Sequence, residues 1–120
     1  ILDVRKNTEF GAGHIPNSIN IGLGGQFASW AGTLISIGTP VAIAAENREQ
    51  VDEAAMRLAR VGIETVKGFI LIADYAGEKS TVEQIPVETV KEKLSGGIQF
   101  VDVRRAAEHA NGHAITTINI

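Results

Sequence analysis

Short apolar runs, each closed by charged or polar residues, alternate along this chain with segments of helical spacing. Four runs have the composition of buried strands: Ile1–Val4, Ser18–Ile21, Val41–Ala45 and the segment that begins with Ile63–Val66. Helices are predicted between them: a short turn that Asn7 is suited to cap, then Gln26–Gly32 and Asn47–Val61. Strands that alternate with helices need parallel crossovers, so the pattern predicts an α/β fold with a parallel sheet.

The segment Asn47–Val61 carries the most complete helix signal. Asn47 is suited to cap its first turn, and Gln50 stands at the reciprocal position of a capping box. Gly62 follows as the expected stop. The apolar positions fall on one face of this helix: Val51, Ala54, Ala55, Leu58 and Val61.

The two ends of the chain are copies of one segment. Residues 1–21 and 100–120 align without a gap at an offset of 99, and the pairs Asp3/Asp102, Arg5/Arg104 and His14/His113 are among the identities. A repeat of this spacing fits tandem globular domains. We therefore expect a fragment of a longer protein: residues 1–76 as a first copy that lacks its N-terminal part, a linker over 77–84, and residues 85–120 as the start of a second copy.

The second copy begins with elements that the first copy lacks. Pro86–Leu94 has the pattern of a helix, and Ile98–Val103 that of a strand. We predict that this strand completes the first sheet by pairing with Ile1–Val4 or Val41–Ala45, which would give a permuted domain.

The composition excludes several classes of partner and of chemistry. A net charge of −3 argues against nucleic acid or an anionic membrane surface as partner, and no apolar run has transmembrane length. The chain has no cysteine, which excludes disulfides, thiolate metal sites and a cysteine nucleophile within these residues. The oligomeric state is left open.

The segment from Asp3-Val4-Arg5 through Gly13-His14-Ile15-Pro16 to Ile19-Asn20-Ile21 resembles the opening of a rhodanese-like domain, and residues 102–120 repeat it. The resemblance implies a small parallel sheet flanked by helices. It also implies a loop after the central strand, where these sulfurtransferases carry a cysteine that takes sulfane sulfur as a persulfide and passes it to a thiol or cyanide.

Counting back from Gly62, which resembles the helix-ending glycine of that family, places Ala45 at the cysteine position. Arg48 then stands at a glycine position and Gln50 at an arginine position of a loop that reads Ala45, Glu46, Asn47, Arg48, Glu49 and Gln50. Glu46 and Glu49 disfavour an anion at this helix terminus, and Arg48 partly offsets them. The resemblance therefore implies a degenerate loop without catalytic residues, cofactor or metal.

A narrower resemblance concerns Gly22–Gly32, which contains Phe27 and Trp30. This stretch is similar to one in rhodanese modules fused to metallo-β-lactamase-fold hydrolases of the persulfide dioxygenase or glyoxalase II kind. It implies an inactive module with a structural, interaction or regulatory role, whose partners are the protein's own upstream or downstream domains, in the cytoplasm. The alternative is a sulfurtransferase whose cysteine lies in the missing half of the second copy.

Several polar residues have structural interpretations that we favour over catalytic ones. Arg5 and Glu9, four residues apart, are expected to form an ion pair, as are Arg104 and Glu108, and Asp3 and Asp102 to accept bonds from nearby backbone N–H groups. His14 and His113 are expected to bond to the backbone. The pair His109 and His113 is a weak metal alternative.

The glycines Gly22, Gly24 and Gly25 follow a strand and precede a helix, and Glu46 comes about 20 residues on, which resembles part of a dinucleotide fingerprint. Phe27 occupies the third glycine position, so we interpret Phe27 and Trp30 as core residues instead. Binding of a nucleotide that is lost on Gly24→Val would support the alternative. The cluster Glu46–Gln50 is either a solvated helix start or a recognition loop without chemistry.

Overall fold

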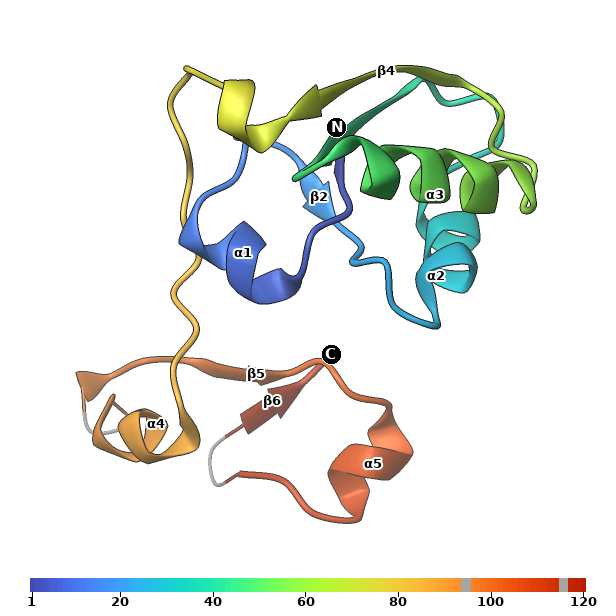
Figure 1. The fold of residues 1–120 in the computed structure, drawn as a ribbon. Helices are drawn as coiled ribbons and strands as arrows, with labels where there is room; N and C mark the ends of the chain where they lie inside the picture. The colour runs from blue at the N-terminus through green and yellow to red at the C-terminus, as the bar shows by residue number, and fades with distance from the viewer. Residues whose placement is uncertain (94–95, 115–116) are drawn as a thin grey trace. The chain divides into compact units, whose positions relative to one another are not determined.

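The computed structural model describes residues 1–93, 96–114 and 117–120 (Figure 1). They divide into two compact units, Ile1–Gln84 (unit 1) and Ile85–Ile120 (unit 2). Each unit has a sheet of its own.

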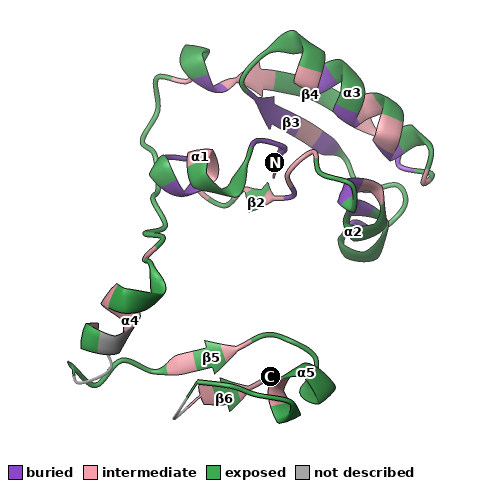
Figure 2. Cartoon of the chain, turned by 60° about the horizontal axis from the view of Figure 1, so that its bottom comes forward, coloured by how far each residue is buried: buried purple, intermediate pink, exposed green. Residues whose placement is uncertain are grey.

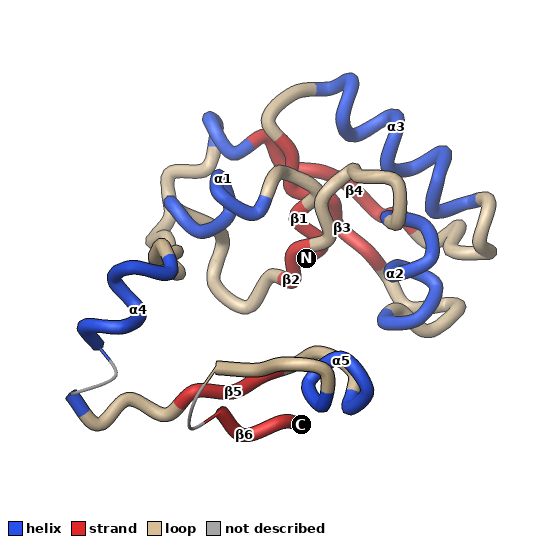
Figure 3. Tube along the Cα trace, turned by 90° about the horizontal axis from the view of Figure 1, so that it is seen from below, coloured by secondary structure: helices blue, strands red, loops and turns tan. Residues whose placement is uncertain are grey.

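Unit 1 is built on a four-stranded parallel sheet in the order β2-β1-β3-β4 (Figure 3). Its strands are β1 (Leu2–Asp3), β2 (Ile19–Asn20), β3 (Val41–Ala45) and β4 (Val66–Leu71). The helices between and after them are α1 (Asn7–Ala12), α2 (Phe27–Leu34), α3 (Arg48–Ala59) and the 3₁₀ turn η1 (Ile72–Asp74). The α/β fold with a parallel sheet flanked by helices is confirmed.

The core of unit 1 lies mainly on the sheet face that α2 and α3 cover. Leu2, Val4 and Ile43 from the strands pack there with Phe27 and Leu58 from the helices, all of them at most 1% exposed. Ala44 points to the opposite face, where it packs with Ile15 and Ile72 in a smaller cluster. Figure 2 shows the buried residues concentrated along β3 and the helices beside it.

The helix predicted over Asn47–Val61 is confirmed as α3, and its caps follow from local chemistry. The Asn47 side chain accepts a hydrogen bond of 3.0 Å from the Gln50 backbone N–H. Val51, Ala54 and Leu58 are buried. Gly62 has a φ of +81°, which a residue with a Cβ adopts only under strain, so the chain turns away from the helix there.

Two details of the other helices differ from the prediction. Asn7 is the first residue of α1, and Lys6 takes the cap position. Trp30 is 55% exposed and outside the core, whereas Phe27 is buried as predicted. The buried positions of α2 and its cap are Phe27, Ala31 and Ile35, four residues apart, and Trp30 lies on the flank of that stripe.

Residues 78–84, which we call the strap, belong to unit 1. His14 and Ser80 exchange two backbone hydrogen bonds of 2.9 Å, and the Val82 N–H donates to the Gly11 carbonyl at 2.9 Å. The Gln84 side chain donates to the Asn7 carbonyl. The stretch predicted as a linker is therefore held against α1 by backbone bonds.

Unit 2 comprises α4 (Val87–Lys93), β5 (Phe100–Asp102), α5 (Ala106–Ala110) and β6 (Thr117–Asn119). Leu94, the predicted end of the first helix, lies outside the described residues. β5 pairs in parallel with β6 in a separate two-stranded sheet. None of the described residues of unit 2 is buried (Figure 2).

The prediction that Ile98–Val103 would pair with Ile1–Val4 or Val41–Ala45 is wrong. β1 already has β2 on one edge and β3 on the other, and β3 has β1 and β4. A strand offers only two edges for hydrogen bonds, so neither strand has room for a further partner.

Candidate functional site

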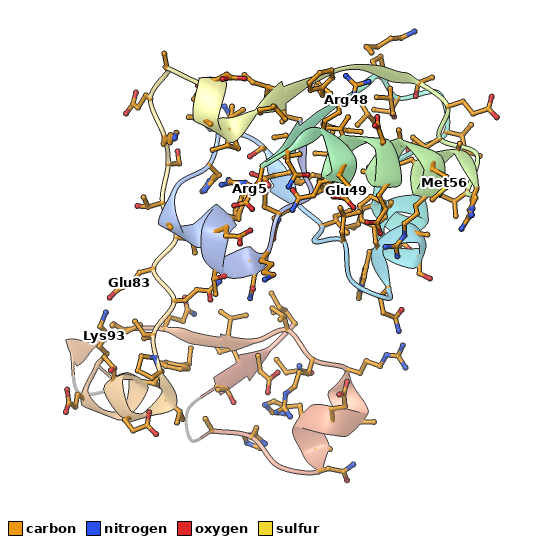
Figure 4. The ribbon with its side chains drawn as sticks, viewed as in Figure 1. Arg5, Arg48, Glu49, Met56, Glu83 and Lys93 are labelled. Carbon is orange, nitrogen blue, oxygen red and sulfur yellow. The ribbon has the colours of Figure 1, made fainter. Side chains whose placement is uncertain are left out.

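The loop after β3 lies at the carboxyl ends of the parallel strands, where ligands of such sheets bind. Ala45 is the last residue of β3 and is completely buried. Glu46 and Asn47 form a bend, and α3 begins at Arg48. Figure 4 shows Arg48 and Glu49 on the first turn of α3. The structure thus brings the predicted loop residues together at one edge of the sheet, with a methyl group at the base of the loop.

The side chains of the loop bind its own backbone. The Glu46 N–H donates to Oε1 of Gln50, and the Gln50 N–H donates to Oδ1 of Asn47, both at 3.0 Å. Only one of the two bonds of the predicted capping box is therefore formed. The Gln50 side chain accepts from the N–H of Glu46, one residue before the cap, and not from that of Asn47. Two N–H groups that would face an anion at a helix N-terminus are satisfied from within the loop.

The charges on the first turn of α3 are arranged along the exposed face of the helix. Arg48 forms an ion pair of 3.0 Å with Asp52, and its guanidinium lies 4.6 Å from the centre of the Phe69 ring. Glu46 and Glu49 are exposed. Since Arg48 is held by Asp52 and Phe69, it compensates the two glutamates less than the sequence led us to expect.

A cavity of about 440 Å³ opens beside this loop. Gln50 borders it from α3, Lys6 from the N-cap of α1 and Asn20 from β2. Asn20 is also a structural residue, because its side chain donates to the carbonyls of Asp3 and Arg5 at 3.0 Å. The cavity therefore has a polar rim with one lysine, and Ala45 is not among its lining residues.

Asp3 and Arg5 form a buried network at the end of β1, and Figure 4 shows Arg5 beside α1. The Arg5 guanidinium binds the Asp3 carboxylate at 2.7 Å and also donates to the Gly13 carbonyl at 2.9 Å. The Arg5 N–H donates to Asp3, which confirms the predicted backbone bond. The predicted pair between Arg5 and Glu9 is wrong, because Arg5 precedes the helix and the spacing of four does not apply.

Unit 2 repeats this network. Arg104 binds the Asp102 carboxylate at 2.6 Å and the Gly112 carbonyl at 2.9 Å, so the predicted pair with Glu108 is also wrong. The Glu108 carboxylate accepts from the Arg105 N–H instead. The hydrogen bonds from the Arg104 side chain and its backbone N–H lower the pKa of Asp102 to about 2.

The histidines bond to the backbone as predicted. Nδ1 of His14 lies 2.9 Å from the Phe10 carbonyl, and its ring stacks on Phe10 at a centroid distance of 3.8 Å. His113 repeats this arrangement with His109. Nε2 of His109 lies 3.2 Å from the Thr117 hydroxyl. Among the described residues, no group of three or more His, Asp or Glu side chains is placed to hold a metal ion.

Arg57 is a site residue that sequence reasoning missed. Its guanidinium donates to the Gly24 carbonyl at 2.7 Å and lies 5.1 Å from the centre of the Phe27 ring. It also pairs with Glu53. Arg57 therefore holds the loop Gly22–Gly25, which we call the glycine loop, against α3. Only its spacing of four residues from Glu53 could have singled it out, and that spacing does not indicate the loop.

A second cavity, of about 450 Å³, also borders the loop Gly22–Gly25. Trp30 and Leu34, which are 55% and 60% exposed, border it from α2. Gly22 packs closely against the backbone, because an added Cβ would lie 3.1 Å from the Arg5 carbonyl oxygen. The loop does follow a strand and precede a helix, but the buried Phe27 fills the third glycine position of the partial fingerprint.

The family model of the rhodanese-like domain matches residues 1–77. The chain belongs to the rhodanese-like domain family. A solved structure, the Alr3790 protein from Anabaena sp., is similar with a TM-score of 0.64 and 17% sequence identity, over 81% of this chain and 83% of that one. At this identity the likeness shows the fold alone. A comparison with curated protein sequences gives no match.

In this family, the loop after β3 is the place where a cysteine is expected. The chain is a rhodanese-like domain without cysteine, and the predicted cysteine position at the end of β3 holds Ala45. No helix within residues 1–93, 96–114 and 117–120 combines the length and the apolar character needed to cross a bilayer.

Proposed function

We propose that unit 1 is a catalytically inactive rhodanese-like module with a structural, interaction or regulatory role within a larger hydrolase or sulfur-handling protein. The observation that carries the proposal is the buried Ala45 at the carboxyl end of β3, in a chain without any cysteine. An alanine methyl group cannot accept sulfane sulfur. No cofactor or metal forms part of this proposal.

The hydrogen bonds of the loop support inactivity independently of Ala45. A persulfide anion at the start of α3 would need free backbone N–H groups. The N–H groups of Glu46 and Gln50 are bound by side chains of the same loop. The carboxylates of Glu46 and Glu49 add negative charge near the place where that anion would form.

The exposed side of α2 supports a role in contact with another domain. Trp30 and Leu34 are large, apolar and more than half exposed, and they share one cavity wall. Tryptophan is enriched at the centres of protein contact sites, and neighbouring exposed apolar side chains on one surface favour such a site. The resemblance of Gly22–Gly32 to modules fused to metallo-β-lactamase-fold hydrolases makes such a domain, in a cytoplasmic protein, the partner that we propose.

The alternative function is that of a sulfurtransferase whose cysteine lies outside these residues. The observation in its favour is the intact network of Asp102, Arg104 and Gly112, which repeats the scaffold of unit 1 in unit 2. Under this alternative, unit 2 would contribute the framework of an active loop that these 120 residues do not contain.

A transfer assay from thiosulfate to cyanide tests the inactivity. We expect no turnover by the chain as it stands. The triple variant Ala45→Cys, Arg48→Gly, Gln50→Arg restores the family's loop residues. We expect its thiolate to take the outer sulfur of thiosulfate, whose S–S bond breaks with release of sulfite, and the gain of one sulfur atom is measured by intact mass.

The matched control carries Ala44→Cys with the same two loop changes. Ala44 faces the smaller core cluster, so its thiol should take up no sulfur. Turnover by the unmodified chain would refute the proposal. Failure of the triple variant to gain sulfur even after Glu46→Gln and Glu49→Gln are added, with the fold intact by circular dichroism, would show that the position assigned to Ala45 is wrong.

A further inference from the structure

The glycine loop, which leads from β2 into α2 (Figure 1), contains two glycines that the fold itself does not explain. Gly24 and Gly25 both line the cavity of about 450 Å³ beside α2. A Cβ built on either glycine would meet no atom within 4 Å, and neither has a φ in the left-handed region. Because glycine loses more conformational entropy on folding than any other residue, an unneeded glycine is a cost. These two glycines keep the space over the cavity open.

The glycine loop is held in place by hydrogen bonds, so mobility does not explain its glycines. The Gly24 carbonyl accepts from the Arg57 guanidinium at 2.7 Å and from the Phe27 N–H at 3.1 Å. The Leu23 N–H donates to the Val4 carbonyl at 3.2 Å. A surface that is ordered before a ligand arrives loses less conformational entropy on binding, so this loop is suited to form one wall of a binding site.

The residues that line the cavity define the chemistry of a ligand. Trp30 and Leu34, both more than half exposed, form an apolar wall, and the buried Phe27 also lines the cavity. The other described residues that line it are uncharged as well. A charged ligand would therefore find no counter-ion in this lining, whereas a flat neutral ring can stack on the indole of Trp30.

Asn20 contributes one polar group of fixed orientation to the same lining. Its side-chain nitrogen donates to the carbonyls of Asp3 and Arg5, both at 3.0 Å, which uses the two N–H bonds of the amide. The amide is thereby held in place, and Oδ1 is the atom that can accept a hydrogen bond from a ligand. A ligand that fits this lining therefore carries a hydrogen-bond donor on its ring.

We propose that the cavity lined by the glycine loop and α2 binds a small, neutral aromatic molecule that carries a hydroxyl or amino group. Its ring stacks on Trp30, and its donor binds Oδ1 of Asn20. Ala45 is not among the lining residues, so binding does not depend on the proposed function. The consequence of binding rests on that function: Trp30 and Leu34 belong to the surface proposed for contact with another domain, and a bound ligand would compete with that domain.

Titration of the 120-residue chain with naphthol, a neutral aromatic alcohol, tests the site. The indole N–H of Trp30, the single tryptophan, and the backbone amide of Gly25 report binding by nuclear magnetic resonance. We expect both signals to shift in a saturable way. Methoxynaphthalene lacks the donor and should bind about three- to tenfold more weakly, which is the contribution of one hydrogen bond. Naphthoate, which is an anion, should also bind more weakly than naphthol.

Substitutions in the cavity provide the second part of the test. Gly25→Leu places a side chain in the open space and should abolish the shift of the Trp30 signal. The matched control is Gly68→Leu, because Gly68 on β4 also has open space at its Cβ and does not line this cavity. Trp30→Ala should weaken binding at least about fivefold, followed at the Gly25 amide. It changes an exposed side chain, so it decides the question if Gly25→Leu fails to fold.

Three results would each overturn the proposal: no saturable shift with naphthol, naphthol binding that survives both Gly25→Leu and Trp30→Ala, or equal binding of naphthol and methoxynaphthalene. A Trp30 signal that shifts with protein concentration alone would also overturn it, since a second copy of the chain would then occupy the cavity. None of these results changes the outcome of the thiosulfate assay, so a failure of this site is distinguishable from a failure of the proposed function.

Discussion

Units 1 and 2 contain the same motif in two different environments. The Asp3–Arg5 and Asp102–Arg104 pairs have nearly the same bond lengths, yet the Arg5 side chain is 5% exposed and that of Arg104 47%. Both pairs join residues two positions apart, and both arginines reach a glycine carbonyl eight residues on. The comparison shows that the motif forms from local interactions, and that its burial comes from β3 and the helices around it.

The difference also decides how much each pair contributes to stability. A buried charge that loses its partner carries a desolvation penalty, whereas an exposed one is solvated by water. The same substitution should therefore have unequal effects in the two units. Trp30 is the single tryptophan of the chain and lies in unit 1, so its fluorescence reports the unfolding of that unit.

The largest expected effect is that of Arg5→Met. It leaves the fully buried Asp3 carboxylate without its counter-ion and should lower the free energy of unfolding of unit 1 by about 3–5 kcal/mol. Urea denaturation followed by Trp30 fluorescence measures it. The matched variant Arg104→Met should leave that transition unchanged. A loss of stability in Arg5→Met no larger than that of an exposed ion pair, about 0–1 kcal/mol, would contradict the importance of burial in unit 1.

A smaller effect is expected where the repeats differ, at Gly11 and Ala110. A Cβ on Gly11 would lie 2.7 Å from the Val82 carbonyl, so Gly11→Ala should displace the strap even though alanine favours a helix. We expect the amides of Ser80 and Val82, which bond to His14 and Gly11, to exchange about tenfold faster.

The reverse substitution Ala110→Gly is the control for the strap. It should leave the exchange of Ser80 and Val82 unaltered, because Ala110 belongs to unit 2. Unchanged exchange in Gly11→Ala would show that the strap does not need the close approach at Gly11.

The smallest expected effect is the titration of Asp102. Its pKa is lowered from 3.8 to about 2 by hydrogen bonds from the Arg104 side chain and backbone. Because the folded pKa lies below the unfolded one, the stabilisation is complete above about pH 4 and is lost as the pH falls through 2. The carboxyl carbon shift of Asp102 measures the midpoint by nuclear magnetic resonance. In Arg104→Gln we expect the midpoint to move back towards 3.8; an unchanged midpoint would mean that Arg104 is not the cause.

Sequence reasoning succeeded where a signal is contained in neighbouring residues. The Asn47 cap and the apolar stripe of α3, the strand at Val41–Ala45 and the backbone bond of His14 were all predicted, because each depends on residues within a few positions. The position of Ala45 at the end of β3 followed from the same strand and helix.

It failed where a residue's partner is distant in the chain or is chosen among several neighbours. Arg57 donates to the carbonyl of Gly24, 33 positions away in the chain, and no local pattern indicates that contact. Trp30 was expected in the core on its hydrophobicity, but the path of α2 turned Ala31 inward instead. Arg5 has two carboxylates nearby, and the direction of the backbone at β1 selected Asp3 over Glu9.

The sequence by itself determined the repeat, the absence of cysteine and the alternation of strands with helices, since these need no knowledge of packing. Only the tertiary structure decided which strands have free edges, and therefore that β5 pairs with β6 rather than with the first sheet. The physical reason is that each strand has two edges, and their occupancy depends on every other strand of the sheet at once. The local motif occurs twice in the chain. It is buried in unit 1 because β3 and the helices surround it there.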